Sequence, residues 1–334
     1  MSRRSAIVCK PQLIDMRKLL FILIAFFVTL TLTAQDAAKK SEKTKAPKSP
    51  TAWKAGGSIS IMGGGGSSKD HYSGLNSEFG FVYGGYVKLY AEKNWGRNVW
   101  TNSLMGGYLR TTASDNEPEL NENKIELNIR YGYKLKNEKW QPGVLLNGRT
   151  QIVNGYDYSY PTPKRTSGFF APAFITFSAG VNVQACKDLN VWLGPAVRWI
   201  TVTNRPYSLN YQGGVKPDGS TEPTLASYYN VDPEKQVRYQ VGPLLSVTWK
   251  KEISKVTLKS RLDAMYDFRN EALAINIFSN SIESGFDLNW STSVNVNLGK
   301  WFTIAGNFDL IYDRDISNSV MYRGFAGIGA ICRF

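Results

Sequence analysis

The sequence predicts an all-β protein that folds as a transmembrane antiparallel up-and-down β-barrel of about 12 strands, with both termini in the periplasm. Three observations predict this fold. Apolar and polar residues alternate with period two over long segments, the expected connections alternate between short and long, and the chain ends on Phe334 after an alternating segment. The mean hydropathy is only -0.28, as expected where two opposite faces average out along each strand.

The N-terminal segment has the pattern of an export signal. Arg17 and Lys18 precede an apolar run of 14 residues, Leu19 to Leu32, which is followed by the small residue Ala34. The run is shorter than the ~20 residues that a membrane-spanning helix needs. Met16 would make a compact start for such a signal. We therefore expect a cleaved signal region at 1–34 with its true start at Met16, a disordered Lys-rich periplasmic segment at 35–52 and the barrel at 53–334.

The clearest alternation covers residues 286–298, where Phe, Leu, Trp, Thr and Val occupy one face and Asp, Asn and Ser the other. Residues 124–135 and 256–267 repeat the pattern, with charged side chains on the polar face only. Strands of soluble proteins average about five or six residues, whereas a tilted membrane strand needs ~9–11. We expect the apolar face to contact lipid and the polar face to line the lumen. The segments 98–110 and 140–153 alternate poorly and are assigned as strands because the even count requires them.

Twelve strands follow from this pattern, an even number as in bacterial single-chain barrels. They are expected near 53–62, 78–91, 98–110, 123–135, 140–153, 172–185, 190–204, 237–250, 255–267, 284–298, 301–313 and 319–334. Short turns are expected near 136–139, 186–189 and 299–300, and longer connections near 63–77, 111–122, 154–171, 205–236 and 268–283. Short turns of such barrels face the periplasm and long loops face outside, which gives the chain its expected orientation. Gly63–Gly66, in the first long connection, is interpreted as a flexible loop.

Tryptophans mark the expected periplasmic ends of the strands. Indole rings favour the headgroup depth of a bilayer, so these tryptophans predict an aromatic girdle. Trp192 and Trp301 have the parity of the polar face, which leaves open that some of them face inward and pack at the turns. The six residues concerned are Trp53, Trp95, Trp140, Trp192, Trp249 and Trp301.

Three stretches of sequence carry a family resemblance. They are LTAQ at the end of the signal region, WKAGGSISI in the opening strand, and the alternating C-terminal strand that ends at Phe334. With them, the chain resembles an uncharacterised family of Bacteroidota outer-membrane β-barrels, catalogued as a domain of unknown function of the three-thousand-and-seventy-eight type. The resemblance covers nearly all of the mature chain and implies a barrel in the cell outer membrane, without catalytic or binding residues. The terminal Phe334 also resembles the strand end that the barrel-assembly machinery recognises, which implies that machinery as a partner.

The predicted lumen carries charges of both signs. Mixed signs in a barrel of this size favour a hydrogen-bonded network that fills or narrows the bore, while a conducting pore lined by the same charges stays open as an alternative. The long connection 205–236 has no periodicity, and a plug or a lid is one interpretation of it. The residues expected to face inward are Lys124, Glu126, Arg130, Arg198, Arg238, Lys259, Arg261, Asp263, Asp267, Asp287, Asp309 and Arg323.

Residue sets for catalysis or metal binding are weak. The single His, His71, lies beside Ser68 and Asp70, but sequence neighbours seldom reach the geometry of a catalytic triad, and an exposed loop histidine is favoured. Acidic residues of the second long connection lack the spacing of an ordered calcium loop, so a solvated acidic loop is favoured. These acidic residues are Asp115, Glu117, Glu119 and Glu122. We therefore expect no enzyme, no cofactor and no metal.

The tyrosine-rich connection is the most distinctive external segment. Tyr156, Tyr158 and Tyr160 could stack on sugars, and Lys164 and Arg165 could pair with lipopolysaccharide phosphates. The favoured interpretation is an upper aromatic girdle joined to a Pro-stiffened loop. Binding through this loop is retained as an alternative.

We expect a non-enzymatic outer-membrane protein that is either a narrow channel or transporter for small solutes or lipids, or a structural protein. The alternatives are a membrane-embedded hydrolase that uses His71 and a surface adhesin or receptor that acts through its long extracellular loops. The expected partners are outer-membrane lipid and lipopolysaccharide. The net charge of +13 is spread among acids, so nucleic acid is not an expected partner. Cys186 and Cys332 are expected on strands about six positions apart and hence unpaired.

Overall fold

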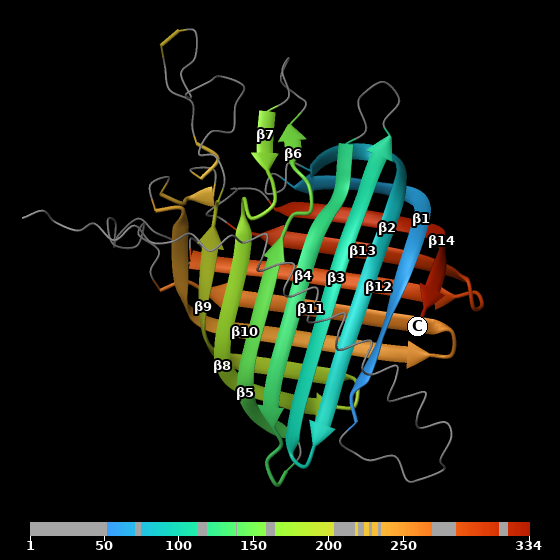
Figure 1. Cartoon of the computed structure of the whole chain (residues 1–334), viewed down its shortest axis with the longest axis vertical. Coiled ribbons are helices and arrows are strands. Elements are labelled where there is room, and N and C mark those ends of the chain that lie inside the picture. Colours follow the sequence, from blue (N-terminus) through green and yellow to red (C-terminus); the bar gives the residue numbers. More distant parts are fainter. Residues whose placement is uncertain are drawn as a thin grey trace, which may run out of the picture.

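Twelve long strands form a closed antiparallel barrel in the order β1-β14-β13-β12-β11-β10-β9-β8-β5-β4-β3-β2 (Figure 1). This computed structural model describes residues 52–70, 75–112, 119–137, 139–157, 164–203, 218–219, 224–226, 229–232, 235–268, 285–313 and 320–334. The barrel strands are β1 (Lys54–Asp70), β2 (Leu75–Trp95), β3 (Asn98–Thr112), β4 (Glu119–Tyr133), β5 (Trp140–Thr150), β8 (Ala173–Cys186), β9 (Leu189–Thr201), β10 (Val237–Ile253), β11 (Val256–Tyr266), β12 (Phe286–Asn297), β13 (Phe302–Tyr312) and β14 (Met321–Arg333). The predicted fold class and strand number are confirmed.

The closing seam lies between β1 and β14, where Gly64 pairs with Gly327. A Cβ atom on Gly64 would overlap the carbonyl oxygen of Ala326, so this inward position of the seam requires glycine. The prediction that Gly63–Gly66 forms a flexible loop is wrong. These residues lie within β1 and pair with both β2 and β14. Hydrogen bonds from two neighbouring strands offset the low strand propensity of glycine.

Several connections are shorter than expected. The first long connection, predicted at 63–77, is mostly strand, because β1 continues to Asp70 and β2 begins at Leu75. The second, predicted at 111–122, loses its ends to β3 and β4. The third contains a separate hairpin that the sequence did not predict, formed by β6 (Gly155–Asp157) and β7 (Lys164–Ser167).

One face of the barrel wall carries exposed apolar side chains. Phe79 is 81% exposed, Ile61 72% and Leu193 58%, and their neighbours on the same parity are also apolar. Such a surface is unfavourable in water and is typical of a barrel that contacts lipid. Among the residues described by the structure, no helix is long and apolar enough to cross a membrane.

The barrel has two unlike ends. We call the turn end the one where β2 joins β3, β4 joins β5, β8 joins β9, β10 joins β11 and β12 joins β13, and the loop end the opposite one. The first barrel strand begins, and the last one ends, at the turn end, since Gly57 and Phe334 exchange backbone hydrogen bonds. The β6–β7 hairpin stands above the rim of the loop end (Figure 1). The periplasmic position of the termini stays a prediction.

The tryptophans at the turn end do not all face outward. Trp140 and Trp249 are exposed, as expected for a girdle, with 48% and 37% of their surfaces accessible. Trp192 is only 1% exposed, and it faces the lumen, as its parity allowed. Cys186 and Cys332 are both free thiols, which confirms that they do not form a disulfide.

Candidate functional site in the lumen

The inner wall carries the predicted charged residues. Side chains of laterally paired residues share a face, and the row Thr176, Arg198 and Gln240 shows how one inward level continues from β8 through β9 to β10. The register and the ion pairs place all of the predicted lumen residues on the inward side of the wall. All of them except Arg130 and Lys259 belong to three groups of contacts.

The first group contains Glu122, Lys124, Asp309 and Arg323. Arg323 donates to Asp309 at 2.8 Å, and Lys124 lies 3.5 Å from Asp309. Glu122 is 3.6 Å from both Lys124 and Arg323. Arg323 and Asp309 are neighbours on β14 and β13, and Glu122 and Lys124 lie on the same strand. Because β4 is separated from β13 by β3, β2, β1 and β14, the Lys124–Asp309 and Glu122–Arg323 pairs join distant walls. All four side chains are buried, and their formal charges cancel.

The second group crosses the bore at Arg261. Its guanidinium lies 3.4 Å from Glu126 on β4 and 2.9 Å from Asp263, next to it on β11. Glu126 also accepts hydrogen bonds from Asn128 at 3.0 Å and from Asn147 at 2.8 Å. A buried carboxylate that is paired and hydrogen-bonded in this way avoids the cost of an isolated buried charge.

The third group lies along one side of the wall, towards the loop end. Arg198 donates to Asp287 at 2.7 Å, and Gln240 donates to the same carboxylate at 3.1 Å. Arg238 lies 3.8 Å from Asp267, whose side chain accepts the backbone N–H of Val241. Together, the three groups make the middle of the lumen a polar network.

An apolar cluster closes over part of the loop end. Within the connection predicted as a possible plug or lid, Leu225 is 0% exposed and Tyr229 is 1% exposed. They pack with inward residues of four strands, and the Tyr229 hydroxyl donates to the carbonyl of Thr166 at 2.6 Å. The inward partners include Phe174, Ile200, Ile311 and Met321. The described part of this connection therefore folds into the mouth of the barrel.

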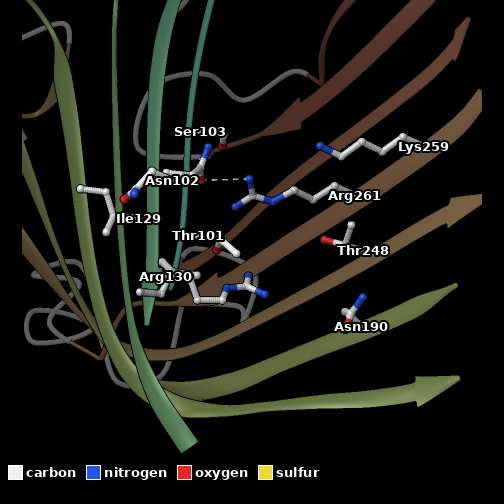
Figure 2. Close-up of a pocket in the computed structure, with 11 residues that line it drawn as sticks. Thr101, Asn102, Ser103, Ile129, Arg130, Asn190, Thr248, Lys259 and Arg261 are labelled. Atoms are coloured by element: carbon white, nitrogen blue, oxygen red, sulfur yellow. Dashed lines mark hydrogen bonds between the residues drawn. The ribbon is translucent and has the colours of Figure 1, made fainter. Parts of the chain in front are cut away.

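Two cavities lie on the other side of the network, towards the turn end. One has a volume of about 350 Å³ and the other about 220 Å³. Thr101, Arg130 and Asn190 line both, so we treat the two cavities as one turn-end vestibule. Figure 2 shows Arg130 on one wall, and Lys259 and Arg261 on the facing wall, pointing into the smaller cavity.

Trp192 supports the wall of the vestibule and contacts two of its neighbours. Its indole N–H donates to the Ser178 hydroxyl at 3.0 Å, and the Arg130 guanidinium lies 5.4 Å from the centre of its ring. Arg130 also donates to the Asn182 side chain at 3.1 Å. This cation–π contact and hydrogen bond fix the orientation of Arg130 at the vestibule.

Other candidate site residues are only partly described. Tyr156 lies in β6, while Tyr158 and Tyr160, like His71, Asp115 and Glu117, lie outside the described residues. The prediction that Glu122 belongs to a solvated loop is wrong, because β4 already begins at Glu119 and Glu122 is buried. The register with β3 skips Asn121 of β4, next to Glu122. Within the described ranges, no group of three or more His, Cys, Asp and Glu side chains is placed to hold a metal ion.

Sequence reasoning missed two lumen cations in addition to the carboxylate of Glu122. Lys88 on β2 and Arg149 on β5 also point inward, as their pairing with Met105 and Glu126 shows. The alternation of inward and outward positions along the predicted strand 78–91 could have placed Lys88 in the lumen. The predicted strand that contains Arg149 alternates poorly, so its sequence does not indicate that Arg149 faces inward.

A family model and several solved structures match this chain. The family model described as "Protein of unknown function (DUF3078)" matches residues 67–156, which run from the end of β1 into β6. The resemblance predicted from the sequence is confirmed over this segment. No curated protein matches the chain.

Similar solved structures are bacterial β-barrels. The translocator domain of the autotransporter NalP from Neisseria meningitidis is 12% identical with a TM-score of 0.39, covering 91% of this chain and 96% of that one. The COG4313 outer membrane channel from Pseudomonas putida F1 is 10% identical with a TM-score of 0.38, covering 87% and 100%. The outer membrane phospholipase OMPLA from Salmonella typhi is 10% identical with a TM-score of 0.36, covering 82% and 90%. These similarities assign no activity.

Proposed function

We propose that this chain is a non-enzymatic outer-membrane protein whose barrel forms a narrow, gated passage for small solutes. The observation that carries the proposal is the set of ion pairs that cross the bore. Arg261 reaches Glu126, and Lys124 reaches Asp309, from nearly opposite walls. An open diffusion pore would keep such charges apart and exposed to water, whereas here they meet at the centre.

The interior supports a gate better than a permanently filled barrel. Its middle is closed by ion pairs and hydrogen bonds, which can exchange partners with water or with a polar solute. A cavity of about 70 Å³ lies on the loop side of the Arg261–Glu126 pair, and the turn-end vestibule lies on the other side of this pair. The closed segment between the cavities is therefore short, and breaking a few polar contacts would connect them.

Recordings in planar bilayers test this proposal. The wild-type barrel is expected to show rare, brief openings at neutral pH. A variant carrying both Glu126→Gln and Arg261→Gln loses the charges that hold the two walls together, and we expect at least a severalfold higher open probability. The control removes the exposed pair Lys251 and Asp188, 3.5 Å apart at the turn end, through Lys251→Gln with Asp188→Asn. Large steady conductance in the wild type, or silence in both lumen and control variants, would refute a gate.

The proposed location is the cell outer membrane, with the turn end and both termini in the periplasm. The exposed apolar side chains on the outer face of the barrel support contact with lipid, and the loop end would then face lipopolysaccharide. Phe334 closes the last strand and is proposed as the contact with the barrel-assembly machinery. Cell fractionation checks the location: we expect the protein in the outer-membrane fraction, with a gel mobility that changes on heating. Recovery as a soluble periplasmic protein would contradict it.

A further inference from the structure

The two sides of the closed network differ in charge. The loop-side cavity is lined by both acids and bases, among them Asp263, Asp287, Asp313, Arg149 and Arg198. The turn-end vestibule is lined by Arg130, Lys134, Lys259 and Arg261, and no described Asp or Glu lines it. The remaining lining residues are mostly neutral polar groups and backbone. The vestibule therefore carries an excess of positive charge.

Most of that positive charge is not neutralised by the protein. Arg261 is paired with Glu126 and Asp263, which lie towards the network. Among the described residues, by contrast, neither Lys259 nor Arg130 has a carboxylate within ion-pair distance; Arg130 contacts only an amide and an indole ring. Glu126 and Asp263 act electrostatically on Lys259, but neither forms an ion pair with it, whereas both pair with Arg261. Cations that outnumber the neighbouring carboxylates cost free energy unless a further anion joins them.

We infer that the turn-end vestibule binds a small hydroxylated organic anion, such as a sugar phosphate or a sugar acid, between Lys259 and Arg130. The phosphate or carboxylate would take the charge-assisted hydrogen bonds of these two side chains. Neutral donors and acceptors around them suit hydroxyl groups on the same ligand. These neutral groups are Thr101, Ser103, Asn128, Asn190 and Thr248.

The size of the site fits this class of ligand. The smaller cavity of about 220 Å³ is below the ~300 Å³ typical of sites for drug-sized molecules. It adjoins the larger cavity, with which it shares three lining residues, so the vestibule as a whole offers the volume of a ligand of one sugar ring. The inference deepens the proposed function by naming the solute class of the passage.

Titration calorimetry on the full chain in detergent tests the inference. Glucose 6-phosphate and gluconate are expected to bind, inorganic phosphate to bind more weakly, and glucose to give no measurable binding. Lys259→Met should weaken the binding of glucose 6-phosphate at least about tenfold, the size of one lost charge-assisted hydrogen bond. Among the described residues, Lys259 forms no hydrogen bond or ion pair that the substitution would remove, so this variant is expected to fold as the wild type does. Arg130→Met should act in the same direction, and Arg130→Lys should retain part of the affinity.

The matched control is Lys187→Met, which removes an exposed cation in the β8–β9 turn outside the vestibule. Its affinity should equal that of the wild type. Equal weakening in the Lys187 and Lys259 variants, or equal binding of glucose and glucose 6-phosphate, would overturn the site, as would no binding of any of the anions. Failure of the anion site is distinguishable from failure of the proposed gate. Binding is measured without any current, and a steadily open barrel could still bind the anion.

Discussion

Replacing Asp309 with alanine is expected to destabilise the folded barrel by about 3–5 kcal/mol. Asp309 accepts a hydrogen bond from Arg323 at 2.8 Å and lies 3.5 Å from Lys124. Its removal leaves two buried cations that share the single carboxylate of Glu122. The cost arises because a buried charge has lost both its partner and its water, not because the intact pair is strongly stabilising on its own.

Urea unfolding in detergent, followed by gel mobility without heating, measures this change. The matched control is Asp188→Ala, which removes the same side chain from a pair with Lys251 at the exposed turn end. That substitution should cost less than about 1 kcal/mol, because solvent screens an exposed pair. Similar losses in the Asp309 and Asp188 variants would mean that the lumen network is hydrated and open.

Replacing Trp192 with alanine is expected to cost about 3–5 kcal/mol. The side chain is 1% exposed and packs with four inward apolar residues, so its removal leaves a large cavity in the wall. The variant also loses the hydrogen bond to Ser178 and the ring beneath Arg130. The apolar neighbours are Leu145, Ala196, Leu244 and Met265.

Trp140→Ala is the control for this prediction. Trp140 lies at the same end of the barrel but is 48% exposed on the outer face, so less contact is lost. The midpoint of guanidinium unfolding in detergent should shift clearly more for the Trp192 variant than for the Trp140 variant. Trp192→Phe should recover part of the loss, because it refills most of the cavity without the N–H donor. An equal shift for the two alanine variants would show that Trp192 does not support the lumen wall.

The local period of the sequence predicted the strands and their two faces. Residues such as Arg261 and Asp287 could be placed on the inward side because side chains of a strand alternate strictly, whatever the strand pairs with. The same local information predicted free cysteines, since Cys186 and Cys332 fall on strands far apart around the barrel. It also left open the inward position of Trp192, which the structure shows.

Which residues pair across the bore depends on the closure of the barrel. Arg261 and Glu126 are 135 positions apart in the chain, and only the number of strands and their register bring them within 3.4 Å. Glu122 was misplaced because β4 begins earlier than predicted, and the bulged residue Asn121 interrupts the alternation of that strand just before Glu122. Gly63–Gly66 was misassigned because glycine has low strand propensity, which pairing on both sides overrides.

The sequence by itself thus determined a barrel with a polar, charged interior and an apolar exterior, because alternation is a property of each strand alone. The tertiary structure decided that the interior is closed, that Leu225 and Tyr229 enter the loop end, and that unneutralised cations gather at the turn end. Those features depend on which residues of distant strands face each other at one height of the bore. Ring closure sets that arrangement, and no local segment of the chain encodes it.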